Sequence, residues 1–298
     1  MAESSPPSAA GKSDAELEET LDRMLTRLAL CDDSKLQALL SKLLPFAISS
    51  LSSPSSAVRN KVLEILNHVN KRVKHQPEIG LPLSDLWRIY TEANVVSIVK
   101  NFCISYIEMA FERTDVKEKE MMAPILAANV SKLPHQHQEI VLRIAAKVIG
   151  ECHSTGVSAQ VAASYRALNN SQDKEGFIEF CLHNILYQRS YQGGGSSPGL
   201  SIAQANRITG KQQLTNDTLL KRKLGILNVV EALELTPEVV YPLYLAASAD
   251  CLEAVARRGD VLLTKKASHV NLKDPSLIKR LFLLFNGMDH ENESITEY

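Results

Sequence analysis

Histidine and cysteine are the residues of this chain best suited to bind a metal or to act as nucleophiles. His135 and His137 lie in Pro-His-Gln-His-Gln with no cysteine or carboxylate at metal-ligand spacing, which favours a solvated turn over a metal site. Cys103 and Cys181 fall within apolar stretches, where a buried cysteine packs as a small hydrophobic residue. We therefore expect no metal, no cofactor and no cysteine nucleophile.

A glycine-rich stretch is the only part of the sequence that suggests a phosphate-binding loop. Gly193-Gly194-Gly195 matches neither G-x-x-x-x-G-K-[ST] nor G-x-G-x-x-G, and no strand precedes it, so we interpret it as part of a linker. Paired glutamate and histidine metal motifs are also missing from the sequence. The sequence thus predicts a protein that is not an enzyme and has no small-molecule substrate. An enzyme with an unrecognised site remains the alternative.

Charge and hydropathy argue against two further classes of function. The formal net charge of −1 over 298 residues gives no general attraction to nucleic acid or to an anionic membrane. We expect the basic runs Lys221-Arg222-Lys223, Arg257-Arg258 and Lys265-Lys266 to keep the surface soluble, since no aromatic residues lie close by for base stacking. The longest apolar stretch, residues 239–247, falls far short of the roughly 20 residues that span a bilayer. We predict no nucleic-acid partner and no membrane insertion.

The N-terminal residues and the cysteines both favour an intracellular protein. Residues 1–13 lack the apolar core of a signal peptide and are typical of a disordered lead-in. The five cysteines are odd in number and widely spaced, which fits free thiols in a reducing compartment better than a disulfide framework.

Apolar residues that recur at steps of three and four predict helices along most of the chain. The clearest helical hairpin covers residues 43–74: Pro54 interrupts it, Ser55 or Ser56 can cap its second helix, and an apolar stripe runs from Val58 to Val73. We expect helices at 14–30, 35–50, 57–74, 81–90, 95–111, 116–130, 136–150, 158–168, 173–189, 215–232, 237–247, 251–266 and 275–286.

Repetition of one segment type points to the architecture. Apolar segments that carry Pro45, Pro124 and Pro242 lie 79 and 118 residues apart, close to two and three steps of about 40. This period predicts an all-α, HEAT- or armadillo-like solenoid of antiparallel helix pairs, with a compact helical bundle as the alternative. We divide the chain into a lead-in (1–13), helical repeats (14–190), a flexible Gly/Ser-rich insertion (191–212), further helical repeats (213–287) and a polar tail (288–298).

Basic side chains of the second hairpin helix are the candidates for partner binding. Arg59 lies on the polar side of this helix, and three further cations follow near its C-terminal end. Cations there favour the negative end of the helix dipole, and on a solenoid they can also meet an acidic protein surface. We predict as partner-binding residues Arg59, Lys71, Arg72 and Lys74.

The sequence also resembles a known family. The matching residues are Ser52-Ser53 through Val58-Arg59-x-Lys61-Val62, His68-x-Asn70-Lys71-Arg72-x-Lys74, Ile79-x-Leu81-Pro82, Val99-x-Asn101-Phe102, Leu224-Gly225-x-Leu227-Asn228 and Pro237-Glu238-x-Val240-Tyr241-Pro242-Leu243-Tyr244-Leu245-x-Ala247-Ser248. On these residues the chain resembles the N-terminal region of the proteasome adaptor and scaffold family, large HEAT-repeat proteins of the 26S proteasome, and is similar to a plant-type member.

The resemblance implies a non-catalytic adaptor with no cofactor. Such a protein helps to hold the regulatory particle of the 26S proteasome to the core particle and acts in assembly and quality control, in the cytoplasm and nucleus. The resemblance implies a regulatory-particle subunit as the partner. Family members are several times longer, so we expect this chain to be truncated or a fragment. A generic HEAT-repeat adaptor that binds other proteins is the alternative.

Overall fold

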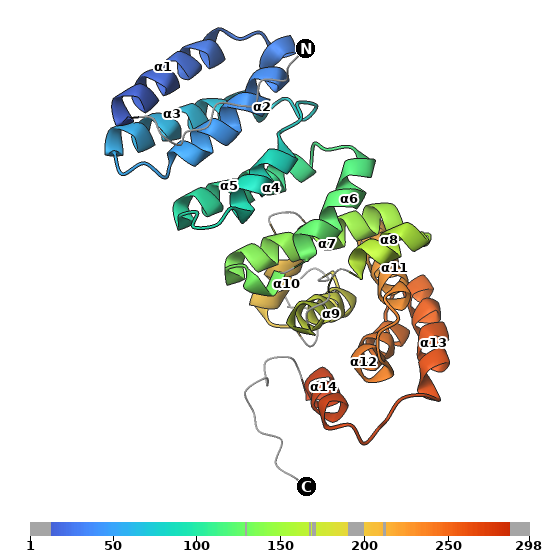
Figure 1. The fold of residues 1–298 in the computed structure, drawn as a ribbon. Helices are drawn as coiled ribbons and strands as arrows, with labels where there is room; N and C mark the ends of the chain where they lie inside the picture. The colour runs from blue at the N-terminus through green and yellow to red at the C-terminus, as the bar shows by residue number, and fades with distance from the viewer. Residues whose placement is uncertain are drawn as a thin grey trace. The chain divides into compact units, whose positions relative to one another are not determined.

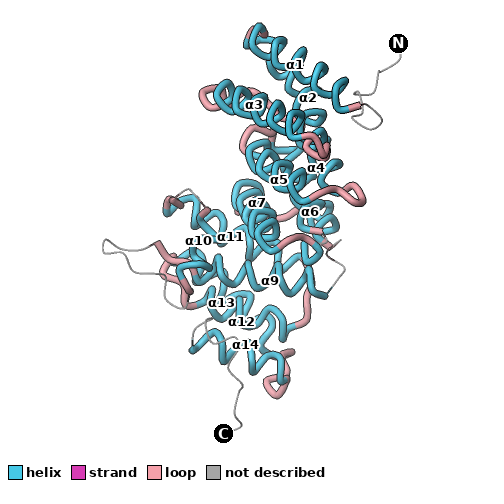
Figure 2. The backbone as a smooth tube through the Cα atoms, turned by 90° about the vertical axis from the view of Figure 1, so that its left-hand side faces the viewer, coloured by secondary structure: helices cyan, strands magenta, loops and turns pink. Residues whose placement is uncertain are grey.

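The structure, a computed structural model, describes residues 13–128, 130–166, 168, 171–189, 200–210 and 213–286. Every regular element in these residues is a helix, and the tube of Figure 2 shows helix and loop without a strand. The chain separates into two compact units, Met1–Asp115 (unit 1) and Val116–Tyr298 (unit 2). The prediction of an all-α protein built from stacked helix pairs is confirmed.

Unit 1 is a regular stack of five helices within its described residues (Figure 1). They are α1 (Asp14–Leu30), α2 (Asp33–Ser50), α3 (Ser56–Val73), α4 (Leu83–Thr91) and α5 (Ser97–Phe111). Helix α3 contacts α1 on one side, and Tyr106 of α5 donates a hydrogen bond to the Asn70 side chain of α3 on the other. Helices α2 and α4 pack against this row.

Helix α3 forms as its sequence predicts. The whole expected apolar stripe is buried, from Val58 through to Val73. The Ser55 hydroxyl accepts a hydrogen bond from the backbone N–H of Val58 at 3.4 Å, which confirms the predicted N-cap. The preceding helix ends at Ser50, so the chain turns before it reaches Pro54.

Unit 2 is larger and less regular. Its described helices are α6 (Val116–Ala127), the 3-10 helix η1 (Val130–Lys132), α7 (His135–His153), α8 (Ala159–Tyr165), α9 (Ser171–Leu186), α10 (Ile202–Thr209), α11 (Asn216–Ala232), α12 (Pro237–Ser248), α13 (Glu253–Ala267) and α14 (Pro275–Asn286). Helix α7 packs against α11, although three helices separate them in the sequence, and α12 pairs with α13.

Glycines allow the close packing of α7 against α11. A Cβ atom on Gly225 would collide with the carbonyl oxygen of Ile149, and one on Gly150 would lie 2.8 Å from the Cα atom of Arg222. Either substitution would push the two helices apart, because buried backbone atoms have no room to move. These two glycines therefore fix how closely α7 and α11 approach.

The three prolines of the predicted repeat lie at related places. Pro45, Pro124 and Pro242 are buried inside α2, α6 and α12, each of which is the first helix of a consecutive pair. The valines expected 13 residues after the first and third prolines, Val58 and Val255, are both fully buried in the second helix of their pair. The repeat read from the sequence therefore corresponds to real helix pairs.

Three expectations differ from the structure. His135 and His137 lie in the first turn of α7 rather than in a loop, and His137 is buried. Arg222 and Lys223 are buried in α11 and do not lie on the surface. Residues 202–209 of the expected flexible insertion form α10, because Ser201 and Gln204 make a capping box and Ile208 is buried.

Some expectations fall on residues that the structure does not describe. These are the lead-in before Ser13, the triple glycine at 193–195 and the tail at 288–298. Among the described helices, none is long and apolar enough to cross a bilayer.

Candidate functional site

Arg59 and Arg72, two of the predicted partner-binding residues, make contacts inside unit 1. The Arg59 guanidinium donates to the carbonyl oxygens of Ser53 and Pro54, both at 2.8 Å, and so closes the turn before α3. Arg72 donates to the carbonyl oxygen of Leu28 at 2.8 Å and pairs with Asp33. Arg72 therefore holds the C-terminal end of α1 to the C-terminal end of α3.

Arg113 repeats this arrangement one helix pair later. It donates to the carbonyl oxygens of Gln76 at 2.6 Å and Val73 at 2.9 Å, at the C-terminal end of α3. Positions 72 and 113 are 41 residues apart, which is about one repeat. The last carbonyls of a helix lack intrahelical donors and carry the negative end of the helix dipole, so a cation from the next repeat stabilises them.

Lys71 and Lys74 differ from the two arginines. Both side chains are exposed, and neither amine makes a hydrogen bond or ion pair with the described part of the chain. Of the four predicted residues, these two keep their charge available to a partner. Their contact with a partner stays a prediction.

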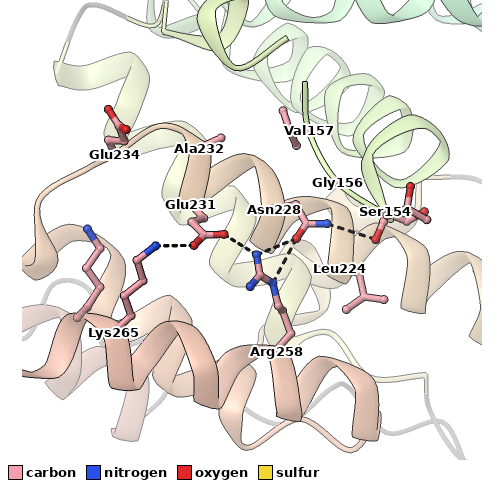
Figure 3. A pocket seen from close by; sticks show the side chains of 12 residues that line it. Ser154, Gly156, Val157, Leu224, Asn228, Glu231, Ala232, Glu234, Arg258 and Lys265 are labelled. Atoms are coloured by element: carbon pink, nitrogen blue, oxygen red, sulfur yellow. Dashed lines mark hydrogen bonds and ion pairs between the residues drawn. The ribbon is translucent and has the colours of Figure 1, made fainter. Parts of the chain in front are cut away.

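Unit 2 contains a groove that sequence reasoning did not find. Its volume is about 820 Å³, and it lies between the end of α7 with the following loop, the middle and end of α11, and α13 (Figure 3). The lining residues are Ser154, Thr155, Gly156, Val157, Leu224, Asn228, Glu231, Ala232, Glu234, Arg258, Lys265 and Lys266.

A hydrogen-bond network crosses this groove. The Asn228 amide donates to the carbonyl oxygens of His153 at 3.0 Å and Ser154 at 3.3 Å, and so satisfies the end of α7. Arg258 of α13 donates to the Asn228 side-chain oxygen at 3.1 Å and to Glu231 at 2.5 Å. Figure 3 shows this chain of bonds from α7 through α11 to α13.

Glu231 is the centre of charge in the network. Partial burial disfavours its ionised form, but hydrogen bonds from Lys265 and Arg258 outweigh this effect and hold the pKa of the carboxyl below its ordinary value of 4.5. Lys265 donates at 2.9 Å, and its side chain remains 63% exposed. Glu231 is thus an anion at neutral pH that pairs with two cations, Arg258 and Lys265.

A second ionic contact of unit 2 lies in the interior. The Lys223 amine pairs with Asp250 at 2.5 Å, and the two side chains are 0% and 1% exposed. The other Asp250 oxygen accepts a hydrogen bond from the backbone N–H of Leu252 at 2.8 Å. The pair joins α11 to the turn before α13 and has no access for a substrate.

The two cysteines in the apolar stretches lie in the core. Cys103 and Cys181 are buried, which confirms the prediction that they pack in the core. Burial raises the pKa of the Cys103 thiol to about 12 and also raises the pKa of Cys181, so both remain protonated at neutral pH. No cluster of three or more His, Cys, Asp or Glu side chains suited to a metal occurs in the described residues.

The fold defines a helical-repeat protein, whose polar side chains join helices and line a surface groove. A sequence model of the family described as "Proteasome component ECM29, N-terminal" matches residues 21–297. The chain belongs to this family. The resemblance read from the sequence is therefore confirmed.

Three relatives show how much of the family the chain covers. The human "Proteasome adapter and scaffold protein ECM29" is 30% identical over 306 residues, which cover 94% of this chain and 16% of the relative. The Drosophila melanogaster "Proteasome-associated protein ECM29 homolog" is 27% identical over 90% of this chain and 14% of the relative. The Schizosaccharomyces pombe "Proteasome component ecm29" is 31% identical over 36% of this chain and 6% of the relative. The chain thus spans about a sixth of the length of its human relative.

The groove residues carry weak signals in the sequence. Asn228 and Glu231 are three residues apart and Arg258 and Lys265 seven apart, so each pair lies on one face of its helix. These spacings indicate a polar face on α11 and another on α13. Only the packing of α11 against α13 brings the two faces together.

Proposed function

We propose that this protein is a non-catalytic adaptor that binds the 26S proteasome through a subunit of its regulatory particle. The support comes from the family match over residues 21–297 and from relatives that are named as proteasome adapter, scaffold or component. Stacked helix pairs suit this role because each pair adds surface without the need for a catalytic centre. We also propose a location in the cytoplasm and nucleus, which microscopy of a tagged chain would check.

The exposed amines of unit 1 are the proposed contact. Lys71 and Lys74 lie at the C-terminal end of α3, where Arg72 fixes the helix end and Arg59 fixes the turn before the helix. In this proposal the two lysines meet an acidic surface of the partner and the two arginines hold α3 in position.

Capture of proteasomes by the tagged chain tests the proposal. The chain should retain regulatory-particle subunits from cell extract at low salt, as identified by mass spectrometry. Lys71→Glu with Lys74→Glu should reduce the captured amount about tenfold, since close charge reversal costs about 1.4 kcal/mol or more. Lys35→Glu with Lys42→Glu, an equal charge change on exposed positions of α2, is the matched control.

The outcomes separate the function from the contact face. A folded chain that captures no proteasome subunit, or that captures only unrelated proteins, overturns the proposed function. Equal losses in the two double variants would leave the function in place and overturn the role of Lys71 and Lys74.

A further inference from the structure

We propose that the groove of unit 2 binds an extended, acidic segment of a protein partner. The inference deepens the proposed function, since such a segment would belong to the assembly that the adaptor joins. The volume of about 820 Å³ lies within the roughly 300 to 1,000 Å³ typical of ligand sites.

The charges of the groove favour an acidic ligand. Three lining side chains are cations, Arg258, Lys265 and Lys266, and two are carboxylates, Glu231 and Glu234. Glu234 pairs with Arg166 at 3.3 Å, which leaves Glu231 alone to balance the three cations. Three positive charges less one negative charge leave an excess of two.

The two lysines are the groups best placed to meet the ligand. Lys265 is paired with Glu231, yet most of its side chain is exposed, so its amine has room for a second acceptor. The Lys266 amine donates only a long hydrogen bond of 3.4 Å to the carbonyl oxygen of Leu235. A carboxylate of the partner can therefore bind between the two amines without breaking the network at Arg258.

The other end of the groove is neutral and open. Figure 3 places Ser154 and Lys265 on opposite sides of Asn228. Within the described residues, a Cβ atom on Gly156 would meet nothing within 4 Å, so the space above the loop is free. An extended chain advances about 3.3 Å per residue, so a short peptide can reach from the lysines to this loop.

The same lining disfavours a nucleic acid. None of the twelve lining residues is aromatic, so bases would find no stacking surface. A peptide with spaced carboxylates matches the cations and leaves its backbone free to contact the Ser154–Gly156 loop.

Fluorescence anisotropy with a labelled peptide tests the inference on the full chain. The probe is an eight-residue peptide of alternating Glu and Gly, and the same peptide with Gln in place of Glu is its control. We expect saturable binding of the Glu peptide at low salt, at least tenfold tighter than the Gln peptide. Lys265→Glu with Lys266→Glu should weaken it at least tenfold, and the control Lys35→Glu with Lys42→Glu, at exposed positions of α2, less than twofold.

Two further variants distinguish a loss of peptide binding from a loss of folding. Lys266→Glu leaves every ion pair of the network intact, and Thr155→Trp fills the groove without changing a charge. With the helical circular dichroism of both unchanged, each should weaken the Glu peptide at least threefold. No saturable binding, equal weakening by the control variant in α2, or equally tight binding of a single-stranded RNA of the same length would overturn the inference.

The test is independent of the proposed function. A chain that captures proteasomes but does not bind the Glu peptide refutes the groove and leaves the adaptor role. A chain that binds the Glu peptide but captures no proteasome refutes the adaptor role and leaves the groove as a binding site.

Discussion

The two units use polar residues in opposite ways. Among the described residues, unit 1 buries Ser50 and Ser53 and no side chain of His, Asp, Glu, Lys or Arg, and Arg72 and Arg113 act at helix ends. Unit 2 buries His137, His153, Asp173, His183, Asn184, Arg222 and Lys223. Both units bury apolar residues along their helices, and unit 2 adds buried polar and charged side chains to its core.

The difference teaches where substitutions will matter. A cation at a helix end remains in contact with water and loses little when its partner is removed. A buried ion that loses its partner keeps the full cost of its removal from water. Charge-changing substitutions should therefore be tolerated at the exposed helix ends of unit 1 and damaging at the buried ion pair of unit 2.

Lys223→Met should produce the largest loss of stability. The substitution leaves the Asp250 carboxylate buried without its ion pair, and such changes cost about 3 to 5 kcal/mol. Urea denaturation followed by circular dichroism measures the free energy of unfolding. The matched change in unit 1 is Lys61→Met, which removes pairs with Asp22 and Glu64 that are open to water and should cost far less. Similar losses in the two variants would contradict the contrast between the units.

His183 should make the stability of unit 2 depend on pH. Burial, aided by the nearby Arg207, lowers the pKa of this imidazole from 6.5 to about 4, even though the Glu179 carboxylate lies 3.8 Å away. The unfolded chain takes up this proton below about pH 6.5 and the folded chain only near pH 4, so stability falls as the pH drops through this range.

The size of this effect follows from the pKa difference. Between pH 7 and pH 5 the contribution of His183 is about 2 kcal/mol. His183→Gln should remove that part of the pH dependence, as measured by urea denaturation at both values. Asn67→Gln, at an exposed position of α3, serves as the control because it changes no titratable group. If His183→Gln shows the same difference in unfolding free energy between pH 7 and pH 5 as the unchanged chain, His183 is not the source of the pH dependence.

Arg72→Gln should have the smallest effect of the three. The variant loses the charged hydrogen bond to the Leu28 carbonyl at the end of α1, which is worth about 1 kcal/mol. Arg113→Gln should cost a similar amount, because it makes the equivalent contact one repeat later. Arg23→Gln removes an exposed pair with Glu19 within one helix and should be close to neutral. Thermal denaturation compares the stability of the three variants. If Arg72→Gln lowers the stability no more than Arg23→Gln does, the contact of Arg72 with the end of α1 does not stabilise unit 1.

The sequence predicted what depends on local spacing. The stripe from Val58 to Val73 and the cap at Ser55 follow from residues that are neighbours on one helix, and both are as expected. The burial of Arg222 and Lys223 was missed because their partners, the Ile208 carbonyl and Asp250, lie on other elements. Helix α10 was missed because a Gly-rich stretch precedes it, although Ser201-x-x-Gln204 is a capping-box pattern.

The sites show the same division. Lys71 and Lys74 are exposed at a helix end, as a helical reading of the sequence suggests, and their binding to a partner remains to be tested. The groove was not predicted, since Glu231 and Lys265 are 34 residues apart and meet only through the packing of α11 on α13. The sequence predicts the polar face of a single helix, but it does not predict which other helix packs against that face.

The contact of α7 with α11 has a consequence for synthesis. In unit 1 each helix packs on others made shortly before it, but Asn216, where α11 begins, follows the end of α7 at His153 by 63 positions. At about 5 to 20 residues per second, a ribosome needs on the order of 3 to 12 seconds to make that stretch. During that time the side of α7 around Gly150 lacks α11 as its packing partner and is accessible to chaperones or to other nascent chains.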